Sequence, residues 1–414
     1  MNRKLLMFLF IMLLLAGCYD RIELEQQSYV VAMGIDKTDR KGVYAFTYQI
    51  ANPEVGSAAG QGGADEAPAE IVTVDGADIL SATHTANSFV TKKITLDHTK
   101  VIVVSEELAR DEDFIRVIQS ASRSPQIRRG VQLVVSREDA SDFINNNKPL
   151  MEQRPHKYYQ FMLDRATQTG IIPEATLHRF FQITEGDADL FLAIYATTEQ
   201  SDQTENKKTE DQYIAGEIPQ IGGSPTQFMG SAVFKEGQMI DTFTGEETRF
   251  AQILDNTLEM ETLFATIPDP LMPEYQIAYN YSQKEDPSIN IQYHKEKPTT
   301  IDVQIPYQAE ILAVPSLIKY SQNKEYQKVL RETLTKRLNE KTAELVRKSQ
   351  EEYRSDPFYW SLYVRKYFKD VKDYEEADWH KKIYPNAKIT VNYKMEKLEF
   401  GKMINDSNLD EVRD

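Results

Sequence analysis

One cysteine stands where the sequence most clearly predicts chemistry. Cys18 is the single cysteine of the 414-residue chain, and it directly follows Leu15-Ala16-Gly17. A basic pair and an uninterrupted apolar run, Leu5 to Ala16, precede it, as in a secretory signal that ends in small residues. Leu-Ala-Gly-Cys has the form of a bacterial lipobox, in which the thiol is diacylated and the chain is cut before the cysteine. We predict a signal peptide over residues 1–17 and lipid attachment at Cys18.

Two other interpretations of this segment are open. The first is an ordinary signal peptide followed by a chance cysteine, and the second is a transmembrane helix. The apolar run is far shorter than the roughly 20 residues that span a bilayer, which disfavours the helix. If Cys18 carries lipid, no thiol is left for a disulfide, a metal or a nucleophile.

Catalytic and metal-binding patterns are missing from the rest of the sequence. The histidines are widely spaced and form neither a His-Glu-x-x-His motif nor a His-x-His pair: His84, His98, His156, His178, His294 and His380. The sequence contains no Gly-x-Ser-x-Gly elbow and no Walker-type phosphate loop, the signatures of two large enzyme classes. We therefore expect no enzyme activity, no catalytic residue, no metal and no cofactor.

The charge balance limits the partners. The chain carries 64 Asp and Glu against 48 Lys and Arg, a formal net charge of −16. Nucleic-acid binding needs a basic footprint, and adhesion to anionic lipid needs a polybasic one, so neither is expected. Membrane attachment must then come from the acyl chains, of which two or more hold stably. No second apolar segment is long enough to span a membrane, so we expect the chain after Cys18 to lie outside the cytoplasm.

The first half of the chain predicts an α+β domain over residues 18–196. Residues 29–36 and 42–50 are rich in β-branched and aromatic side chains and predict a hairpin. From residue 70 to 144 short apolar strands alternate with segments of helical periodicity. A wholly polar stretch then predicts a linker or loop over residues 197–213, because it has nothing to bury in a core.

The second half predicts a β-rich middle domain over residues 214–300 and a C-terminal α+β domain over residues 301–414. Strand patterns between 229 and 312 predict a hairpin and then a meander. Tyr320 to Tyr353 predicts one long amphipathic helix that packs on a core. The expected fold class is therefore α+β, multi-domain, with mixed or antiparallel sheets, packed helices and a long helix near residues 320–353.

Several short motifs together resemble the Ger(x)C family of spore germination lipoproteins. The matching stretches are Gly17-Cys18-Tyr19-Asp20-Arg21-Ile22-Glu23-Leu24, Gly34-Ile35-Asp36-Lys37, Asn52-Pro53, residues 97–110, and Gly230 to Lys235 followed by Gly245-Glu246-Glu247-Thr248-Arg249. Two stretches depart from the family pattern. Tyr19 stands where the family usually has Trp, and Asp356-Pro357-Phe358-Tyr359-Trp360 replaces a glycine-containing Asp-Ile/Val-Phe-Gly-Phe-Gly stretch. Both departures keep large aromatic side chains.

The resemblance implies a function in spore germination. Family members are C subunits of nutrient germinant receptors and work with two membrane subunits, A and B, at the spore's inner membrane. By that resemblance, this chain would be a non-enzymatic subunit anchored by lipid on the outer face of the cytoplasmic membrane. Ligand recognition would lie in the B subunit, so we expect no direct small-molecule binding.

Partner-contact candidates come from the matching motifs: Gly34, Asp36, Gly245, Glu246 and Glu247. The alternative is that the first two form a turn and the glutamates begin a helix, where acids are favoured. For the whole chain, the alternative function is a solute-binding lipoprotein that delivers a small ligand to a transporter. A cell-envelope hydrolase would need a nucleophile or metal constellation that the sequence does not show.

Overall fold

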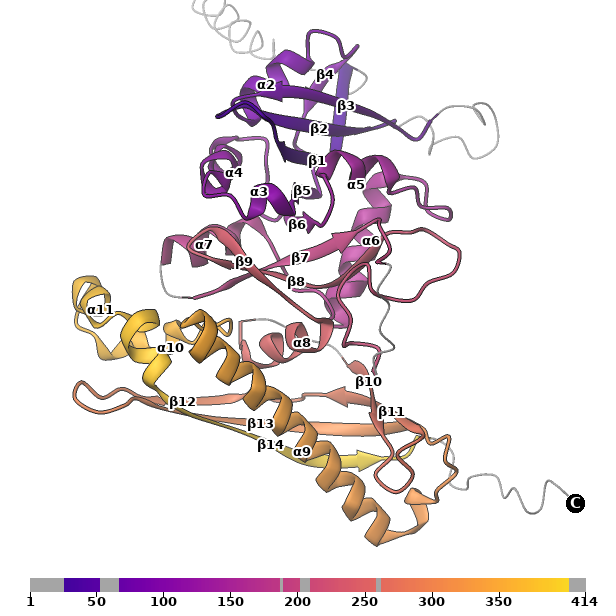
Figure 1. The fold of residues 1–414 in the computed structure, drawn as a ribbon, viewed down its shortest axis with the longest axis vertical. Helices are drawn as coiled ribbons and strands as arrows, with labels where there is room; N and C mark the ends of the chain where they lie inside the picture. Colours follow the sequence, from indigo (N-terminus) through magenta and orange to yellow (C-terminus); the bar gives the residue numbers. More distant parts are fainter. Residues whose placement is uncertain (1–25, 53–66, 187–188, 202–208, 258–261, 402–414) are drawn as a thin grey trace, which may run out of the picture.

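The structure is a computed structural model that describes residues 26–52, 67–186, 189–201, 209–257 and 262–401. Its described part contains two mixed β-sheets with helices packed on them. In Figure 1 the first sheet occupies the upper part of an elongated molecule and the second sheet the lower part, with α8 between them. The predicted multi-domain α+β class is confirmed.

The first sheet combines a parallel centre with antiparallel margins. Its strand order is β3-β2-β1-β5-β6-β7-β8-β9, and β4 pairs with β1 outside this path. Strands β1, β5, β6 and β7 are parallel neighbours, whereas β2 and β3 on one side and β8 and β9 on the other are antiparallel. The bounds are β1 Gln27–Lys37, β2 Tyr44–Ala51, β3 Ala69–Gly76, β4 Lys93–Thr95, β5 Val101–Ser105, β6 Gln132–Ser136, β7 Phe191–Thr197, β8 Gln227–Lys235 and β9 Gln238–Phe243.

Helices of the first half connect and cover these strands. The bounds are α2 Ile79–Ala86, α3 Glu106–Ala109, α4 Phe114–Arg123, α5 Ala140–Asn146, α6 Pro155–Gln168 and α7 Leu177–Gly186. The hairpin expected from residues 29–36 and 42–50 is confirmed as the antiparallel pair β1–β2. Every residue of β5 and of β7 is buried, which explains their continuous apolar runs.

The second sheet is built around one long strand, β13. Its order is β10-β11-β13-β12, and β14 pairs with β13 in parallel. The bounds are β10 Leu263–Pro268, β11 Gln276–Ser282, β12 Ser288–Gln292, β13 Thr300–Ala313 and β14 Lys388–Glu399. Strand β12 pairs with the first part of β13 and β11 with its last part. The expected meander is therefore replaced by two short strands that lie end to end along β13.

The long helix α9 (Lys324–Lys348) crosses the second sheet, as Figure 1 shows. Asn323 accepts hydrogen bonds from two amides of its first turn, a side-chain N-cap. Its buried side chains recur at helical spacing and join the second core: Leu330, Leu334, Leu338, Thr342, Leu345 and Val346. A π-turn, η4 (Ser349–Tyr353), extends it. The predicted amphipathic helix is confirmed, and its apolar stripe faces the protein's own core.

Shorter helices complete the two halves. They are α8 Gly245–Leu254, η3 Tyr320–Gln322, α10 Ser361–Val364, η5 Arg365–Tyr367, α11 Val371–Ala377, η6 Trp379–Ile383 and η7 Tyr384–Asn386. Figure 1 places α10 and α11 at the end of α9 that lies below α7.

Residues of the expected middle domain, 214–300, contribute to both sheets. Strands β8 and β9 extend the first sheet, because β8 pairs antiparallel with the buried strand β7. Strands β10, β11 and β12 belong to the second sheet. The polar stretch 197–213 thus connects β7 to a strand of the same sheet.

Candidate functional site

The predicted anchor, Cys18, lies outside the described residues. Among the residues that are described, none of the helices combines the length and apolar character needed to cross a bilayer.

Gly34 and Asp36 both lie within β1 and dock helix α5. Asp36 Oδ1 accepts the Ala140 amide at 2.6 Å, and Oδ2 accepts the Ser141 amide at 2.9 Å. Burial raises the pKa of the Asp36 carboxyl, and these two amides oppose the shift. At Gly34, a Cβ atom would lie 3.0 Å from Ile144 Cδ1, so the glycine lets α5 approach the sheet. The two residues form part of a strand rather than the turn that the alternative proposed.

The Gly-Glu-Glu-Thr motif begins helix α8. Thr244 Oγ1 accepts the Glu247 amide at 3.2 Å, and Glu247 Oε2 accepts the Thr244 amide at 2.9 Å. This reciprocal pair is a capping box, which satisfies two amides that the helix leaves free. A Cβ atom at Gly245 would lie 2.6 Å from Met229 Sδ. The absence of a side chain therefore lets the start of the helix pack closely against β8.

Glu246 and Glu247 connect α8 to the long helix α9. Arg337 Nη2 lies 2.6 Å from Glu246 Oε1, and Lys348 Nζ lies 3.0 Å from Glu247 Oε1. Burial and the nearby Asp211 raise the pKa of Glu246, and Arg337 opposes that shift. Two acids that are adjacent in sequence therefore hold two points of α9.

Helix α8 is also bonded to the part of the chain that carries the first sheet, called the first domain from here on. Arg249 Nη1 lies 2.9 Å from Asp211 Oδ2, and its Nε donates to the carbonyl of Thr169 at 3.1 Å. Gln252 Nε2 donates to the carbonyl of Gly170 at 2.9 Å. Helix α8 is thus a joint between the first domain and α9. Arg249 belongs to the Gly-Glu-Glu-Thr-Arg motif, but its role at this joint depends on residues that are distant in sequence and so has no local signal.

A pair of buried carboxyl groups lies at a second junction of the two halves. Asp189 is 7% exposed and Asp356 is fully buried, and their backbones form a parallel bridge. Trp379 Nε1 donates to Asp356 Oδ2 at 2.6 Å, and the Ser361 hydroxyl donates to Asp189 Oδ2 at 2.5 Å. Burial raises the pKa of Asp356 to about 6 and that of Asp189 well above its ordinary value. One sequence feature points to this place: Asp356 begins the aromatic stretch that departs from the family pattern.

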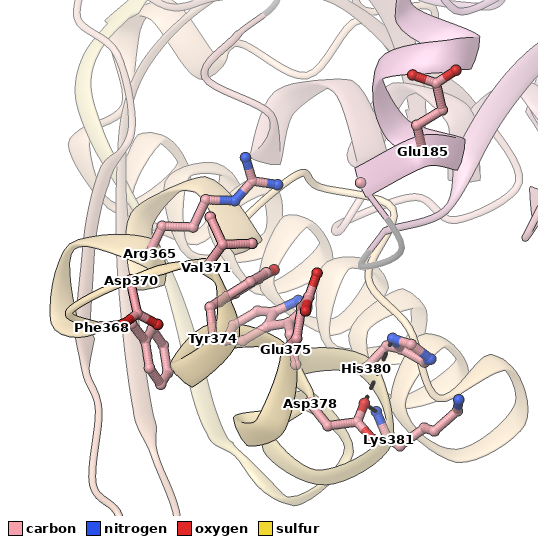
Figure 2. A pocket seen from close by; sticks show the side chains of 12 residues that line it. Glu185, Arg365, Phe368, Asp370, Val371, Tyr374, Glu375, Asp378, His380 and Lys381 are labelled. Carbon is pink, nitrogen blue, oxygen red and sulfur yellow. Dashed lines mark hydrogen bonds and ion pairs between the residues drawn. The ribbon is translucent and has the colours of Figure 1, made fainter.

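A cavity of about 660 Å³ opens beside this pair, between the end of α7 and the C-terminal helices (Figure 2). Arg365 lies 5.5 Å from the centroid of the Tyr374 ring, and His380 Nδ1 lies 3.8 Å from Asp378 Oδ1. Burial raises the pKa of Tyr374 to about 12. The lining carries both signs of charge: Glu185, Gly186, Arg365, Phe368, Asp370, Val371, Tyr374, Glu375, Asp378, Trp379, His380 and Lys381.

The five partner-contact candidates are thus brought together in two groups, one at α5 and one at α8. Their side chains and close packing serve bonds within the chain. Contact with a partner stays a prediction for all of them. Among the described residues, no group of three or more His, Cys, Asp or Glu side chains is arranged to hold a metal ion.

The comparisons with known proteins all point to one family, the spore germination proteins. The family described as "Spore germination protein N-terminal domain" matches residues 20–197, and "Spore germination B3/ GerAC like, C-terminal" matches residues 229–401. The chain is similar to a putative spore germination protein, YfkR, of Bacillus subtilis, with 27% identity over 345 residues, or 80% of this chain and 81% of that protein. It is also similar to spore germination protein B3 of the same organism, with 21% identity over 96% of this chain and 98% of the relative.

A solved structure shares the fold. The crystal structure of the GerBC protein superimposes with a TM-score of 0.52 at 16% sequence identity, covering 91% of this chain and 99% of that one. The matched N-terminal and C-terminal domains together account for most of the sequence. The chain therefore belongs to the Ger(x)C family of spore germination proteins, as its motifs predicted.

Proposed function

We propose that this protein is the lipid-anchored, non-enzymatic C subunit of a nutrient germinant receptor, working with membrane subunits A and B. The observation that carries the proposal is the order of features along the chain. The first family match begins at residue 20, two residues after the lipobox cysteine, and the second ends at residue 401. The whole family-like body therefore follows the predicted anchor at Cys18.

A lipid anchor would suit a subunit that makes weak contacts with membrane partners. Tethering confines the chain to the surface where subunits A and B lie and raises its effective concentration there. Two or more acyl chains hold a protein at a bilayer stably, whereas one chain binds only marginally. The acidic composition offers no electrostatic substitute for such an anchor.

The bonding of the motif residues supports a structural rather than a catalytic role. The acids of the Gly-Glu-Glu-Thr motif are paired with Arg337 and Lys348, and Asp36 caps a helix. Charged side chains that are held in this way organise the joints of the protein. Its function would then be to present a rigid body to its partners on the outer face of the cytoplasmic membrane.

The test is nutrient-triggered release of dipicolinate from spores that lack this gene, with Cys18→Ala as the companion strain. We expect deletion to abolish the response to some nutrient while other triggers still work, and Cys18→Ala to reproduce that defect. Tyr19→Trp is the matched control, because it leaves the lipobox intact and restores the family's usual residue. Normal responses of the deletion strain to every nutrient would contradict the proposal. A normal response of the Cys18→Ala strain would show that the receptor function does not need the lipid anchor.

A further inference from the structure

The buried carboxyl pair joins two parts of the fold that are distant in sequence. Asp189 lies two residues before the start of the first-sheet strand β7, whereas Asp356 follows the long helix α9 and η4. The Leu190 amide donates to the Asp356 carbonyl at 2.8 Å. The Ser361 hydroxyl, from α10, donates to the Asp189 carboxyl. The pair therefore lies at a seam between the first domain and the C-terminal helices.

The hydrogen bonds around the pair satisfy both oxygens of Asp356 but only one oxygen of Asp189. Asp356 Oδ1 accepts the amides of Phe358 and Trp360 at 3.0 and 3.1 Å, and Oδ2 accepts the Trp379 indole. Among the described residues, no N–H or O–H group donates to Asp189 Oδ1. The parallel bridge pairs Asp189 with Asp356, and residues paired in this way carry their side chains on the same face, so the two buried carboxyl groups are neighbours. Two carboxylates that share a buried site cannot both stay ionised, so one of them holds a proton, for which Asp189 Oδ1 is an available acceptor.

We propose that Asp189 and Asp356 share a single proton and act as a pH-dependent latch that holds the first domain to the C-terminal helices. Loss of the shared proton would place two negative charges side by side in a site that water does not reach. Such charges repel each other strongly in a medium of low dielectric constant. The latch therefore opens when the pair loses its proton, and this inference does not depend on the proposed receptor function.

The surrounding charged and titratable groups provide little compensation. Arg365, on η5, is the cation that acts on Asp189, and it lies over the ring of Tyr374 on α11. Tyr359, Tyr374 and Tyr384 also surround the pair, and burial raises the pKa of each, so they remain neutral. On η6, His380 is directed at Glu236 and Asp378, at 3.8 Å from each.

The neighbouring cavity offers a route for the proton. Trp379 donates to Asp356 and also lines the cavity of about 660 Å³, together with Arg365 and Tyr374. Figure 2 shows the labelled Arg365 and Tyr374 side chains along this cavity. Solvent in the cavity is therefore one side chain away from the pair, and the pair can exchange its proton without unfolding of the whole chain.

The direction of the pH effect follows from the raised pKa values of the pair. Burial comes first among the causes for both groups, and the contact with Asp356 adds to the shift of Asp189. The folded chain thus keeps a proton that the unfolded chain has lost above pH about 4. The pair's contribution to stability is then largest below that pH and falls as the pH rises through the folded-state titration. One proton gives up to a tenfold change in the unfolding equilibrium constant per pH unit.

The chain carries its own probe of the latch. It contains two tryptophans, and Trp360 and Trp379 are both buried and both hydrogen-bonded to Asp356. The experiment follows tryptophan emission and the melting temperature of the full chain in detergent from pH 5 to pH 10. We expect the emission to shift to the red and the melting temperature to fall as the pH rises. A flat response in both would overturn the proposal.

Asp189→Asn tests the shared proton directly. Its amide would donate permanently to Asp356, and its oxygen would accept the Ser361 hydroxyl as Asp189 Oδ2 does. This variant should keep the emission seen at pH 5 up to pH 10 and lose the part of the melting-temperature change that the pair causes. Unchanged pH dependence would refute the latch. Glu375→Gln is the matched control, because Glu375 lines the cavity but does not contact the pair, and it should retain the parent's pH dependence.

A second measurement, made on the parent chain, tests the proposal even if the Asp189→Asn variant does not fold. Infrared difference spectra of the parent chain report protonated carboxyl groups directly. We expect a buried protonated carboxyl band at pH 6 that disappears as the tryptophan emission changes. A spectrum without such a band, or a band that titrates separately from the emission, would overturn the proposal.

Discussion

Replacing Asp36 by alanine should destabilise the chain, because its carboxylate serves the first turn of helix α5. Both carboxylate oxygens accept backbone amides there, at 2.6 and 2.9 Å, and the side chain is 5% exposed. Loss of a side-chain cap costs about 0.5–2 kcal/mol, and each buried amide left unpaired costs about 1–3 kcal/mol. Removal of a buried charge offsets part of this, since burial raises the pKa of Asp36.

The net expectation is a loss of about 2 kcal/mol in the free energy of unfolding, within the range for lost caps and unpaired amides. The assay is urea unfolding followed by circular dichroism, comparing midpoints at equal m-values. Asp139→Ala is the matched control. Asp139 is the residue at the N-cap position of the same helix, is exposed, and makes no side-chain capping bond. This control should change stability by less than about 0.5 kcal/mol.

The same experiment separates the two roles considered for Asp36. If Asp36→Ala unfolds at the parent's urea midpoint yet abolishes the nutrient response, the capping argument is refuted and a partner contact is supported. If stability falls as expected, a germination defect of this variant follows from the loosened helix.

Three further changes test the joint at α8, each by urea unfolding. Gly230→Ala should cost more than about 3 kcal/mol, because φ there is +79° and the new Cβ would lie 2.2 Å from the Phe243 carbonyl oxygen; a smaller loss would show that the strand relaxes. Thr244→Ala should cost about 1 kcal/mol through the lost cap, and an unchanged midpoint would contradict the capping box. Arg337→Ala should cost about 2–3 kcal/mol by leaving Glu246 unpaired. That loss should shrink as the pH falls and Glu246 is protonated; a pH-independent loss would instead indicate packing.

Much of the local structure could be predicted because it depends on neighbouring residues. The β1–β2 hairpin and helix α9 follow from residue patterns that repeat every two or every three to four positions. The family also followed from short motifs in order, such as Gly34 to Lys37 and Gly245 to Arg249. Each of these signals lies within one stretch of sequence.

Pairing between distant segments could not be predicted in the same way. The sequence of strand β8 is compatible with the start of a new domain or with a partner of β7, and only the backbone pairing in the assembled sheet decides between them. The parallel pairing of β14 with β13 and the end-to-end placement of β11 and β12 are likewise decided by the assembled core. A hydrophobic pattern shows that a strand is buried but does not identify its neighbour.

The same distinction between local signals and distant contacts applies to the charged residues. The sequence by itself determined the anchor motif at Cys18, the family and the acidic composition. Only the tertiary structure decided that Asp36 caps a helix 104 residues away and that Asp189 meets Asp356. The physical reason is that a carboxyl group's pKa and partners depend on burial and on groups brought together in space, neither of which is written in adjacent residues.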